Sequence, residues 1–263
     1  MAACFISYPR AIVKKFLFVD LDDTLFQTPG KCAAETDLRP AAYLKDGSVC
    51  SFTTSRQRAF FELMHREMTL IPATARNHDA LRRVDLPFSS HAIIDYGGVI
   101  LAPDGSPDGD WLDLMRADMA LALDGLKEAI AVIDDYCASV GLKGRARLIE
   151  DFATPFYIVV KDPDKQAERL ALIEREALMP WITSATGQHF YLHRNGNNLA
   201  VLPKTLNKAR AVHYLRQQLE KEHGDIMTLG MGDSQSDARF MAACDYAIVP
   251  SGTQLAALTV AAL

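Results

Sequence analysis

The chain has 263 residues, of which 49% are hydrophobic and 23% charged, and its formal net charge is −5. This length and composition are typical of a globular protein that buries a core in one large domain or two smaller ones. The mild negative charge argues against partners such as nucleic acid or an anionic membrane, and no apolar run approaches the roughly 20 residues of a membrane-spanning helix.

The cysteine content and the opening segment bear on the compartment. Five scattered cysteines without a CxxC pair predict reduced thiols in a cytoplasmic protein, not a disulfide framework or a zinc site. They are Cys4, Cys32, Cys50, Cys137 and Cys244. The opening segment MAACFISYPRAIVKK lacks the layout of a signal peptide, because its basic residues follow a short apolar stretch broken by Pro9.

The first predicted element is a strand over Phe16–Asp20, whose apolar run reads as buried on both faces. Asp22 and Asp23 follow at once. Carboxylates crowded at the end of a buried strand repel one another and cost desolvation free energy. Such a cluster raises the question of what offsets its charge.

Local signals define the next elements. Asp-Gly between apolar runs predicts a β-hairpin over Ala41–Phe52, and the capping-box spacing of Thr54 and Gln57 predicts a helix after it. Leu70–Thr74 is the second predicted core strand. A helix through Asp79–Arg83 leads to the segment SHAIIDYGGVIL, which predicts a pair of strands with a bend at its two glycines.

A loop rich in Gly, Pro and Asp, Asp104–Asp110, is the predicted domain boundary. After it we expect one or two helices over Trp111–Val140, strands at ARLIED and FYIVVKD, a helix from Pro163 through Leu178 and a strand at HFYLH. This block reads as a separate small α+β unit.

The core pattern is predicted to resume with the strand Asn198–Pro203, followed by a helix over about Asn207–Glu222, the strand Asp225–Asp233, a short helix and the strand YAIVP. Alternating strands and helices predict an α/β fold with a mostly parallel sheet. We therefore expect a discontinuous core domain, residues 1–103 and 197–263, and an inserted α+β domain, residues 104–196.

Polar residues end three of the predicted core strands, at the edge where open parallel sheets bind ligands. These are Asp20 with Asp22, Thr74, and the segment GDSQSD, which contains Asp233 and Asp237. A helix starting at Ser234 would point Asp233 and Asp237 to one side. Carboxylates gathered at one edge need a counter-charge, for which Mg²⁺, a hard cation that prefers oxygen ligands, is the economical answer.

A magnesium ion held by few carboxylates takes up a phosphate oxygen, so this edge points to phosphoryl chemistry. A carboxylate could act as nucleophile and form an aspartyl-phosphate. The Thr74 hydroxyl and the Lys208 ammonium would surround the phosphoryl oxygens. Lys204, four residues earlier in the chain, is a rival for the role of Lys208.

DLDDT, Thr74, Lys208 and GDSQSD, in that order, resemble the motifs of the haloacid dehalogenase superfamily of phosphohydrolases, and they span most of the chain. The resemblance implies a Rossmann-like core. It implies that Asp20 is the nucleophile and that Asp22 is the general acid and then the general base. It also implies that Thr74 and Lys208 hold the phosphoryl group, and the family spacing favours Lys208 over Lys204.

The same resemblance implies a Mg²⁺ site made by Asp20, the backbone carbonyl of Asp22 and Asp233, with Asp237 in direct or water-mediated support. The inserted block resembles the large α+β cap of the Cof-type and sucrose-phosphate-phosphatase-like branch. The segments ATAR and NLAVLPKTLNKARAV are similar to segments of that branch, although Ala75 stands where a glycine is usual.

These features predict a Mg²⁺-dependent phosphatase whose partner is a small phosphate ester, with a sugar phosphate as the favoured class. Two alternatives stay open: a phosphomannomutase-like phosphotransferase, and a non-catalytic regulator that binds a metabolite. The particular substrate and the oligomeric state are not predicted.

Several polar residues outside the four motifs have two interpretations each. Arg76 could touch substrate, but an exposed salt bridge is the favoured interpretation. In the inserted unit, the hairpin-like segment HFYLHRNGNN and Lys161 could bind sugar hydroxyls or simply form a polar turn. The polar residues of that segment are His193, Arg194, Asn195 and Asn197.

Overall fold

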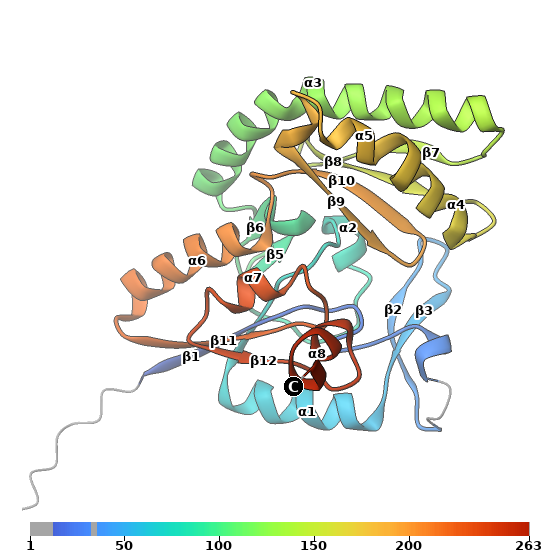
Figure 1. Ribbon diagram of the computed structural model, residues 1–263. Helices are drawn as coiled ribbons and strands as arrows, with labels where there is room; N and C mark the ends of the chain where they lie inside the picture. The colour runs from blue at the N-terminus through green and yellow to red at the C-terminus, as the bar shows by residue number, and fades with distance from the viewer. Residues whose placement is uncertain (1–12, 33–35, 263) are drawn as a thin grey trace, which may run out of the picture.

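The computed structural model describes residues 13–32 and 36–262 of the chain. Figure 1 shows two parts, a core that contains β1, β11 and β12 and, above it, a cap that is crossed by the long helix α3. Residues 1–12 of the opening segment, which include Cys4, lie outside the described residues, so the two predictions that fell on them stay predictions. Within those residues, no helix has the length and apolar character needed to cross a membrane.

The core is built on a four-stranded sheet in the order β12-β11-β1-β4, in which every neighbouring pair is parallel. The predicted α/β fold with a mostly parallel sheet is therefore confirmed. The strands are β1 (Lys14–Val19), β4 (Thr69–Pro72), β11 (Ile226–Met231) and β12 (Tyr246–Ile248).

Strand β1 is apolar on both faces because helices cover both sides of the sheet. Phe18 packs in one hydrophobic cluster with residues of α6 (Lys208–His223). Its neighbour Val19 points the other way and packs in a second cluster with α1 (Ser55–Glu67). Burying such side chains contributes roughly 1.5–3 kcal/mol each. The position of Asp20, the next residue, is thus set by a strand anchored on both faces.

The hairpin and capping predictions for the first part of the chain are confirmed. Strands β2 (Arg39–Tyr43) and β3 (Val49–Thr53) pair in antiparallel fashion. At the start of α1, the Thr54 hydroxyl accepts a hydrogen bond from the Gln57 N–H (3.2 Å), and the Gln57 side chain accepts one from the Thr54 N–H (3.0 Å). These bonds satisfy N–H groups that the first helical turn leaves without partners.

A second hairpin lies beyond the short helix α2 (His78–Leu81). It consists of β5 (Ala92–Ile94) and β6 (Val99–Leu101), joined by the turn Asp95–Gly97. The bend predicted at the glycines is present, and Gly97 has a φ of +100°, which favours glycine.

The cap has a four-stranded antiparallel sheet in the order β7-β8-β10-β9, covered on one face by α3 (Gly109–Val140) together with the helical segments that follow β8. The strands are β7 (Arg145–Asp151), β8 (Thr154–Lys161), β9 (Phe190–Asn195) and β10 (Asn198–Pro203). The helix expected after Pro163 is three consecutive segments, α4 (Ala167–Leu172), a π-helical turn (Ile173–Leu178) and α5 (Met179–Ile182).

The prediction that Asn198–Pro203 resumes the core sheet is wrong. This strand, β10, pairs with β8 and β9 in the cap. Its side chains alternate between the interior of the cap, where Leu199 lies, and the cluster shared with the core, where Leu202 lies. A strand buried on both faces has the same apolar pattern in either sheet. We propose that the second boundary of the inserted domain lies after Pro203 and not at residue 196.

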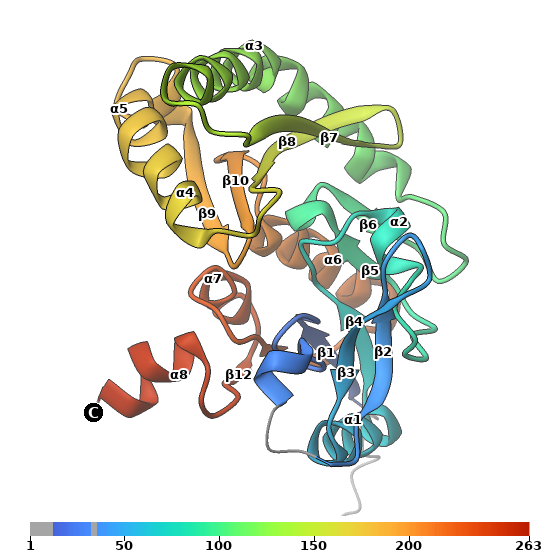
Figure 2. The ribbon, with the colours of Figure 1, turned by 90° about the vertical axis from the view of Figure 1, so that its right-hand side faces the viewer.

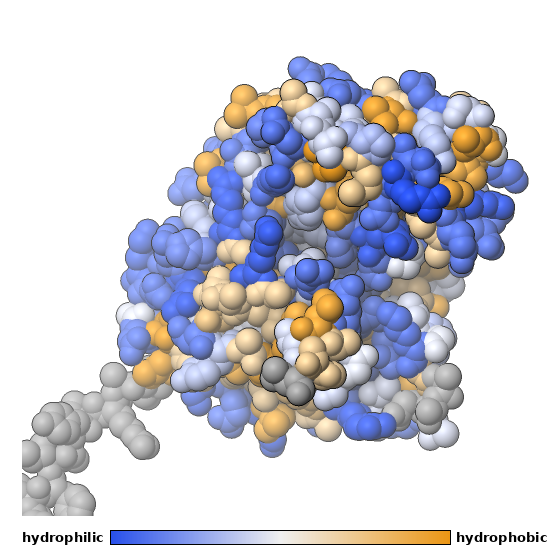
Figure 3. Space-filling model, in the orientation of Figure 1, coloured by the Kyte–Doolittle hydropathy of each residue, from blue (hydrophilic) through white to orange (hydrophobic). Residues whose placement is uncertain are grey.

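Cap and core share one hydrophobic cluster, which contains Phe156 of β8 as well as Phe18 of β1. The approach is close at Gly98, where an added Cβ would lie 2.7 Å from the Phe156 ring. Figure 2 shows the cap sheet standing over the core from the side. On the face in Figure 3, hydrophilic and hydrophobic residues are interspersed, and a hollow lies between the two parts.

Candidate active site

The carboxyl ends of three adjacent strands carry the predicted site residues. Asp20 directly follows β1, the central strand of the three. Thr74 follows β4 on one side, and Asp233 follows β11 on the other. Lys208 is the first residue of α6, whose N-cap is Asn207. The fold therefore gathers residues that are far apart in the chain.

Lys208 joins two of the acids in a buried ion-pair network. Its Nζ donates hydrogen bonds to Asp20 Oδ1 (2.6 Å) and to Asp237 Oδ1 (2.8 Å). The three side chains are 7%, 9% and 1% exposed, respectively. The rival Lys204 is exposed to solvent. Of the two lysines, the structure thus places Lys208 at the strand ends.

The protonation of this network follows from burial and charge. Burial opposes the charge of Lys208, but the carboxylates of Asp20 and Asp237 outweigh it and raise the pKa of Lys208 above its ordinary value. Burial raises the pKa of Asp20, although the Lys208 charge acts in the opposite direction. More positive charge at this point would therefore favour the ionised form of Asp20.

Asp20, Asp233 and Asp237 can each direct one carboxylate oxygen to a common point, since these oxygens lie within 4.8 Å of one another. Burial, followed by the charge of Asp237, raises the pKa of Asp233 to about 6. When all three carboxyl groups are ionised, the Lys208 ammonium offsets only one of their negative charges. A cluster of oxygen donors with excess negative charge fits a hard divalent cation such as Mg²⁺.

Asp233 and Asp237 meet through a turn, not through the first turn of a helix as predicted. Helix α7 begins only at Ala238 (Ala238–Met241). The Asp237 carboxylate accepts hydrogen bonds from the Ser234 N–H (3.1 Å) and the Ser234 hydroxyl (2.6 Å). Gly232 permits this arrangement, because a Cβ there would lie 2.4 Å from the Asp237 Cβ.

The Asp22 carboxylate lies apart from the acidic cluster and is held by Arg76. Arg76 Nε donates to Asp22 Oδ2 (2.8 Å), and Arg76 Nη2 donates to Asp22 Oδ1 (2.7 Å). The expected salt bridge of Arg76 is present, but the arginine side chain is only 14% exposed. The backbone N–H of Arg76 also donates to Thr74 Oγ1 (3.1 Å). The feature of the sequence that points to Arg76 is its position two residues after Thr74.

Thr24, in the first motif, is a site residue that the sequence did not single out. Its hydroxyl donates to Asp233 Oδ1 at 3.4 Å and so connects the turn after β1 to the turn after β11. Thr74 itself is buried. Its N–H donates to the Ile93 carbonyl (2.9 Å), which fixes its backbone beside β5.

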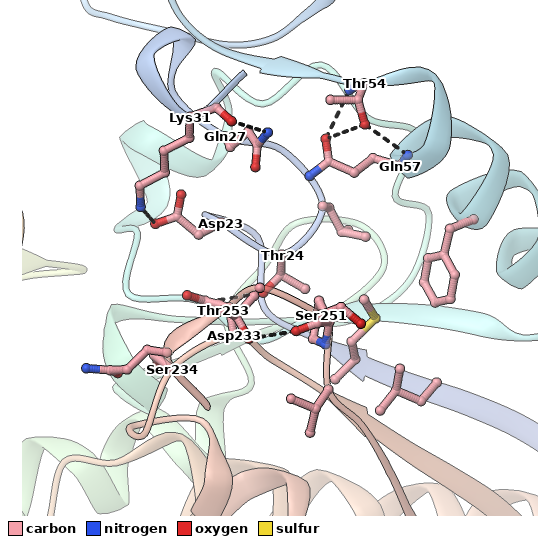
Figure 4. Close-up of a pocket in the computed structure, with 18 of the residues that line it drawn as sticks. Asp23, Thr24, Gln27, Lys31, Thr54, Gln57, Asp233, Ser234, Ser251 and Thr253 are labelled. Atoms are coloured by element: carbon pink, nitrogen blue, oxygen red, sulfur yellow. Dashed lines mark hydrogen bonds and ion pairs between the residues drawn. The ribbon is translucent and has the colours of Figure 1, made fainter. Parts of the chain in front are cut away.

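A cleft of about 910 Å³ opens beside the acidic cluster, between the core and the β9–β10 hairpin of the cap. In the view of Figure 4, Gln27, Gln57 and Thr54, which line the cleft, lie above Thr24, Asp233 and Ser234, which also line it. The cap contributes His193, Arg194 and Asn195. No described residue of the Ala41–Phe52 hairpin lines this cleft; the start of α1 does so instead.

The cap residues for which the sequence allowed two interpretations, sugar binding or a polar turn, have different surroundings. Arg194 lines the cleft and donates to Glu174 (2.6 Å). Asn197 instead exchanges hydrogen bonds with the backbone of Asp162, at 2.8 and 3.1 Å, and so holds the hairpin turn. The hairpin interpretation is confirmed, and three of its residues also face the cleft.

Comparisons with known proteins agree with this architecture. Residues 172–260 match the family described as sucrose-6F-phosphate phosphohydrolase. No curated protein sequence matches the chain. Many solved structures resemble it, at low sequence identity.

Three examples have TM-scores of 0.50 or above. The Plasmodium falciparum IMP-nucleotidase has a TM-score of 0.58 at 12% identity, over 91% of this chain and 65% of its own. The C-terminal domain of the C. albicans trehalose-6-phosphate phosphatase has a TM-score of 0.55 at 11% sequence identity, over 88% of this chain and 73% of its own. The structure of Thermoplasma acidophilum 0175 has a TM-score of 0.50 at 13% sequence identity, over 92% of this chain and 93% of its own. At such low sequence identities, the similarity shows the fold alone.

Proposed function

We propose that this chain is a phosphohydrolase of the haloacid dehalogenase superfamily and that it hydrolyses a small phosphorylated metabolite, a sugar phosphate, through an aspartyl-phosphate on Asp20. One observation carries the proposal. Asp20 is held at the end of a buried strand by Lys208 (2.6 Å), next to the carboxylates of Asp233 and Asp237, and a separate carboxylate, Asp22, stands two residues away. A phosphatase of this kind needs both a nucleophile and an acid/base.

The reaction has two steps. In the first, an oxygen of Asp20 attacks the phosphorus, the bond to the ester oxygen breaks, and Asp22 gives that oxygen a proton. In the second, a water molecule attacks the phosphorus of the aspartyl-phosphate and passes a proton to Asp22. The bond between this phosphorus and the Asp20 oxygen breaks, inorganic phosphate leaves, and Asp20 is restored as a carboxylate.

The remaining residues orient these groups. Asp20, Asp233 and Asp237, with the backbone carbonyl of Asp22, would hold a Mg²⁺ ion, which when bound reduces the repulsion between the phosphate and the attacking carboxylate. Lys208 fixes Asp20 and adds positive charge near the transferred group. Thr74 is proposed to bind a phosphoryl oxygen through its hydroxyl.

The cleft supports a sugar as the rest of the substrate. Its polar lining is rich in amides and hydroxyls, which can both donate to and accept from sugar hydroxyls. These residues are Gln27, Gln57, Asn195, Ser251, Thr253 and Gln254. The matched family is named for the phosphate ester of a disaccharide, and a cleft of about 910 Å³ has room for a leaving group of that size.

The test is hydrolysis of p-nitrophenyl phosphate and of sucrose 6-phosphate, trehalose 6-phosphate and glucose 6-phosphate, with and without Mg²⁺. We expect Mg²⁺-dependent release of inorganic phosphate by the wild type and a loss of at least about 10³-fold in kcat for Asp20→Asn. Asp37→Asn, which changes an exposed acid away from the site, is the control.

Two results would count against the proposal: no turnover by the wild type, or turnover in Asp20→Asn equal to that of the wild type. An isomerised sugar phosphate in place of inorganic phosphate would instead indicate a phosphotransferase. Binding of beryllium fluoride, a phosphate mimic, at Asp20 would exclude a non-catalytic regulator.

A further inference from the structure

We propose that Arg76 is a positioning residue for this reaction: its guanidinium holds the Asp22 carboxylate in the orientation from which Asp22 protonates the leaving oxygen. The inference rests on the proposed function, since it assigns Asp22 the acid role. Arg76 lies outside the acidic cluster. The evidence for its role is the pair of hydrogen bonds that join it to Asp22, a residue 54 positions away in the chain.

The contact has the geometry of a two-pronged ion pair. Both Arg76 nitrogens meet separate Asp22 oxygens, at 2.8 and 2.7 Å, so the plane and the direction of the carboxylate are both fixed. A carboxylate accepts about four hydrogen bonds, two on each oxygen. Each Asp22 oxygen therefore keeps capacity for the leaving group or for water while the arginine remains bound.

Arg76 can act as a rigid support because the protein holds it on several sides. Its Nη1 donates to the Ala80 carbonyl (3.3 Å), and its guanidinium carbon lies 5.2 Å from the centre of the Phe26 ring. Its backbone carbonyl accepts from the Asp95 N–H (2.9 Å). The arginine side chain is 14% exposed, whereas that of Asp22 is 43% exposed. The better-fixed partner thus positions the freer one.

Asp22 needs such support for a physical reason. It follows Asp20 by two residues, and Lys208 is already engaged by Asp20 and Asp237. A half-exposed side chain without a partner would spread over several rotamers, and only some of them reach the leaving oxygen. Misplacement of a catalytic group by about 1 Å can cost roughly 10²-fold in rate.

A purely structural role for Arg76 makes a different prediction. If Arg76 only connects the loops after β1 and β4, its removal lowers all activities in the same proportion. If it positions a general acid, its removal harms only those esters whose leaving group needs a proton. An alkyl alkoxide, such as that of a sugar, needs one; p-nitrophenolate is stable without one.

The experiment compares kcat/KM for two esters in the same variant, so the fraction of folded protein cancels. The alkyl ester is the sugar phosphate that the wild type hydrolyses fastest, and the other ester is p-nitrophenyl phosphate. For Arg76→Met we expect a loss of about 10²-fold or more on the sugar phosphate and less than about 10-fold on p-nitrophenyl phosphate. The KM for the sugar phosphate should change little.

Three further variants complete the design. Asp22→Asn should show the same selectivity between esters, and adding Arg76→Met to it should cause little further loss, because the two residues act as a unit. Arg76→Lys should recover only part of the activity, since lysine cannot form the two-pronged contact. Arg83→Met, which removes a neighbouring arginine paired with Asp79, should leave the ratio unchanged.

Equal losses of kcat/KM on both esters, or additive losses in the double variant, would overturn this inference. The proposed function would still stand if the wild type is active and Asp20→Asn is inactive. An active Asp20→Asn would overturn the proposed function first.

Discussion

At the scale of single residues, Asp233 shows how burial and a like charge tune one carboxyl group. Burial and the charge of Asp237 raise its pKa to about 6 in the protein without bound metal. A cation binds the ionised carboxylate, so the proton and the metal compete for the same group. The site is therefore sensitive to mild acid, although most carboxyl groups ionise well below that pH.

We predict that the affinity for Mg²⁺ falls as the pH drops through about 6, by up to roughly tenfold for each further pH unit. The sign follows from the raised pKa: below it Asp233 carries a proton that the cation must displace. Calorimetric titration with Mg²⁺ between pH 5 and 7.5 measures the effect. Asp233→Asn should bind weakly throughout with a much flatter pH dependence, and an unchanged wild-type affinity from pH 7.5 to 5 would refute the prediction.

At the scale of elements, the turn between β5 and β6 supports the start of α6. Gly97 has a φ of +100°, and an added Cβ would lie 2.6 Å from the carbonyl oxygen of Asn207, the N-cap of α6. Lys208 is the next residue. A turn in one hairpin thereby sets the position of a lysine that comes more than a hundred residues later in the chain.

Gly97→Ala should therefore lower both stability and activity. The strained backbone and the clash with α6 should cost about 1–3 kcal/mol in the free energy of unfolding, measured with urea, and displacement of Lys208 should lower kcat. Gly47→Ala is the matched control: Gly47 also has a positive φ, +82°, but no atom lies within 4 Å of its added Cβ. It should lose some stability and keep its activity; equal losses of activity in both variants would contradict the account.

At the scale of the whole molecule, a buried acid marks the contact between cap and core. Asp95, in the core, is fully buried, and neither of its carboxylate oxygens makes a hydrogen bond of normal geometry with any residue that the structure describes. Burial, reinforced by the charge of Asp151 at the end of β7 in the cap, raises the pKa of Asp95 well above its ordinary value. The folded protein therefore favours the protonated form.

A raised pKa in the folded state contributes stability that is complete below the ordinary pKa of about 4 and is lost as the pH rises through the raised value. We predict that Asp95→Asn, which cannot ionise, is more stable than the wild type at pH 7.5, by about 1 kcal/mol or more. Its advantage should shrink toward pH 4. Thermal unfolding from pH 4 to 8 tests this, with Asp113→Asn as an exposed control; equal pH slopes in wild type and variant would refute it.

Local patterns in the sequence were sufficient for much of the fold. The strand before Asp20, the hairpin over Ala41–Phe52 and the capping box of Thr54 and Gln57 were all predicted, because each depends on residues close together in the chain. The motif order was enough to select Asp20, Lys208, Asp233 and Asp237, which the fold brings together. Their catalytic roles remain predictions.

Only the tertiary structure decided which surfaces and side chains meet. It assigned β10 to the cap sheet, closed Asp233 onto Asp237 by a turn, and paired Arg76 with Asp22. These outcomes depend on which faces are buried against which neighbours. An apolar strand reads the same in either sheet, and an arginine carries no local signal for a partner far away in the chain, so composition and spacing could not determine them.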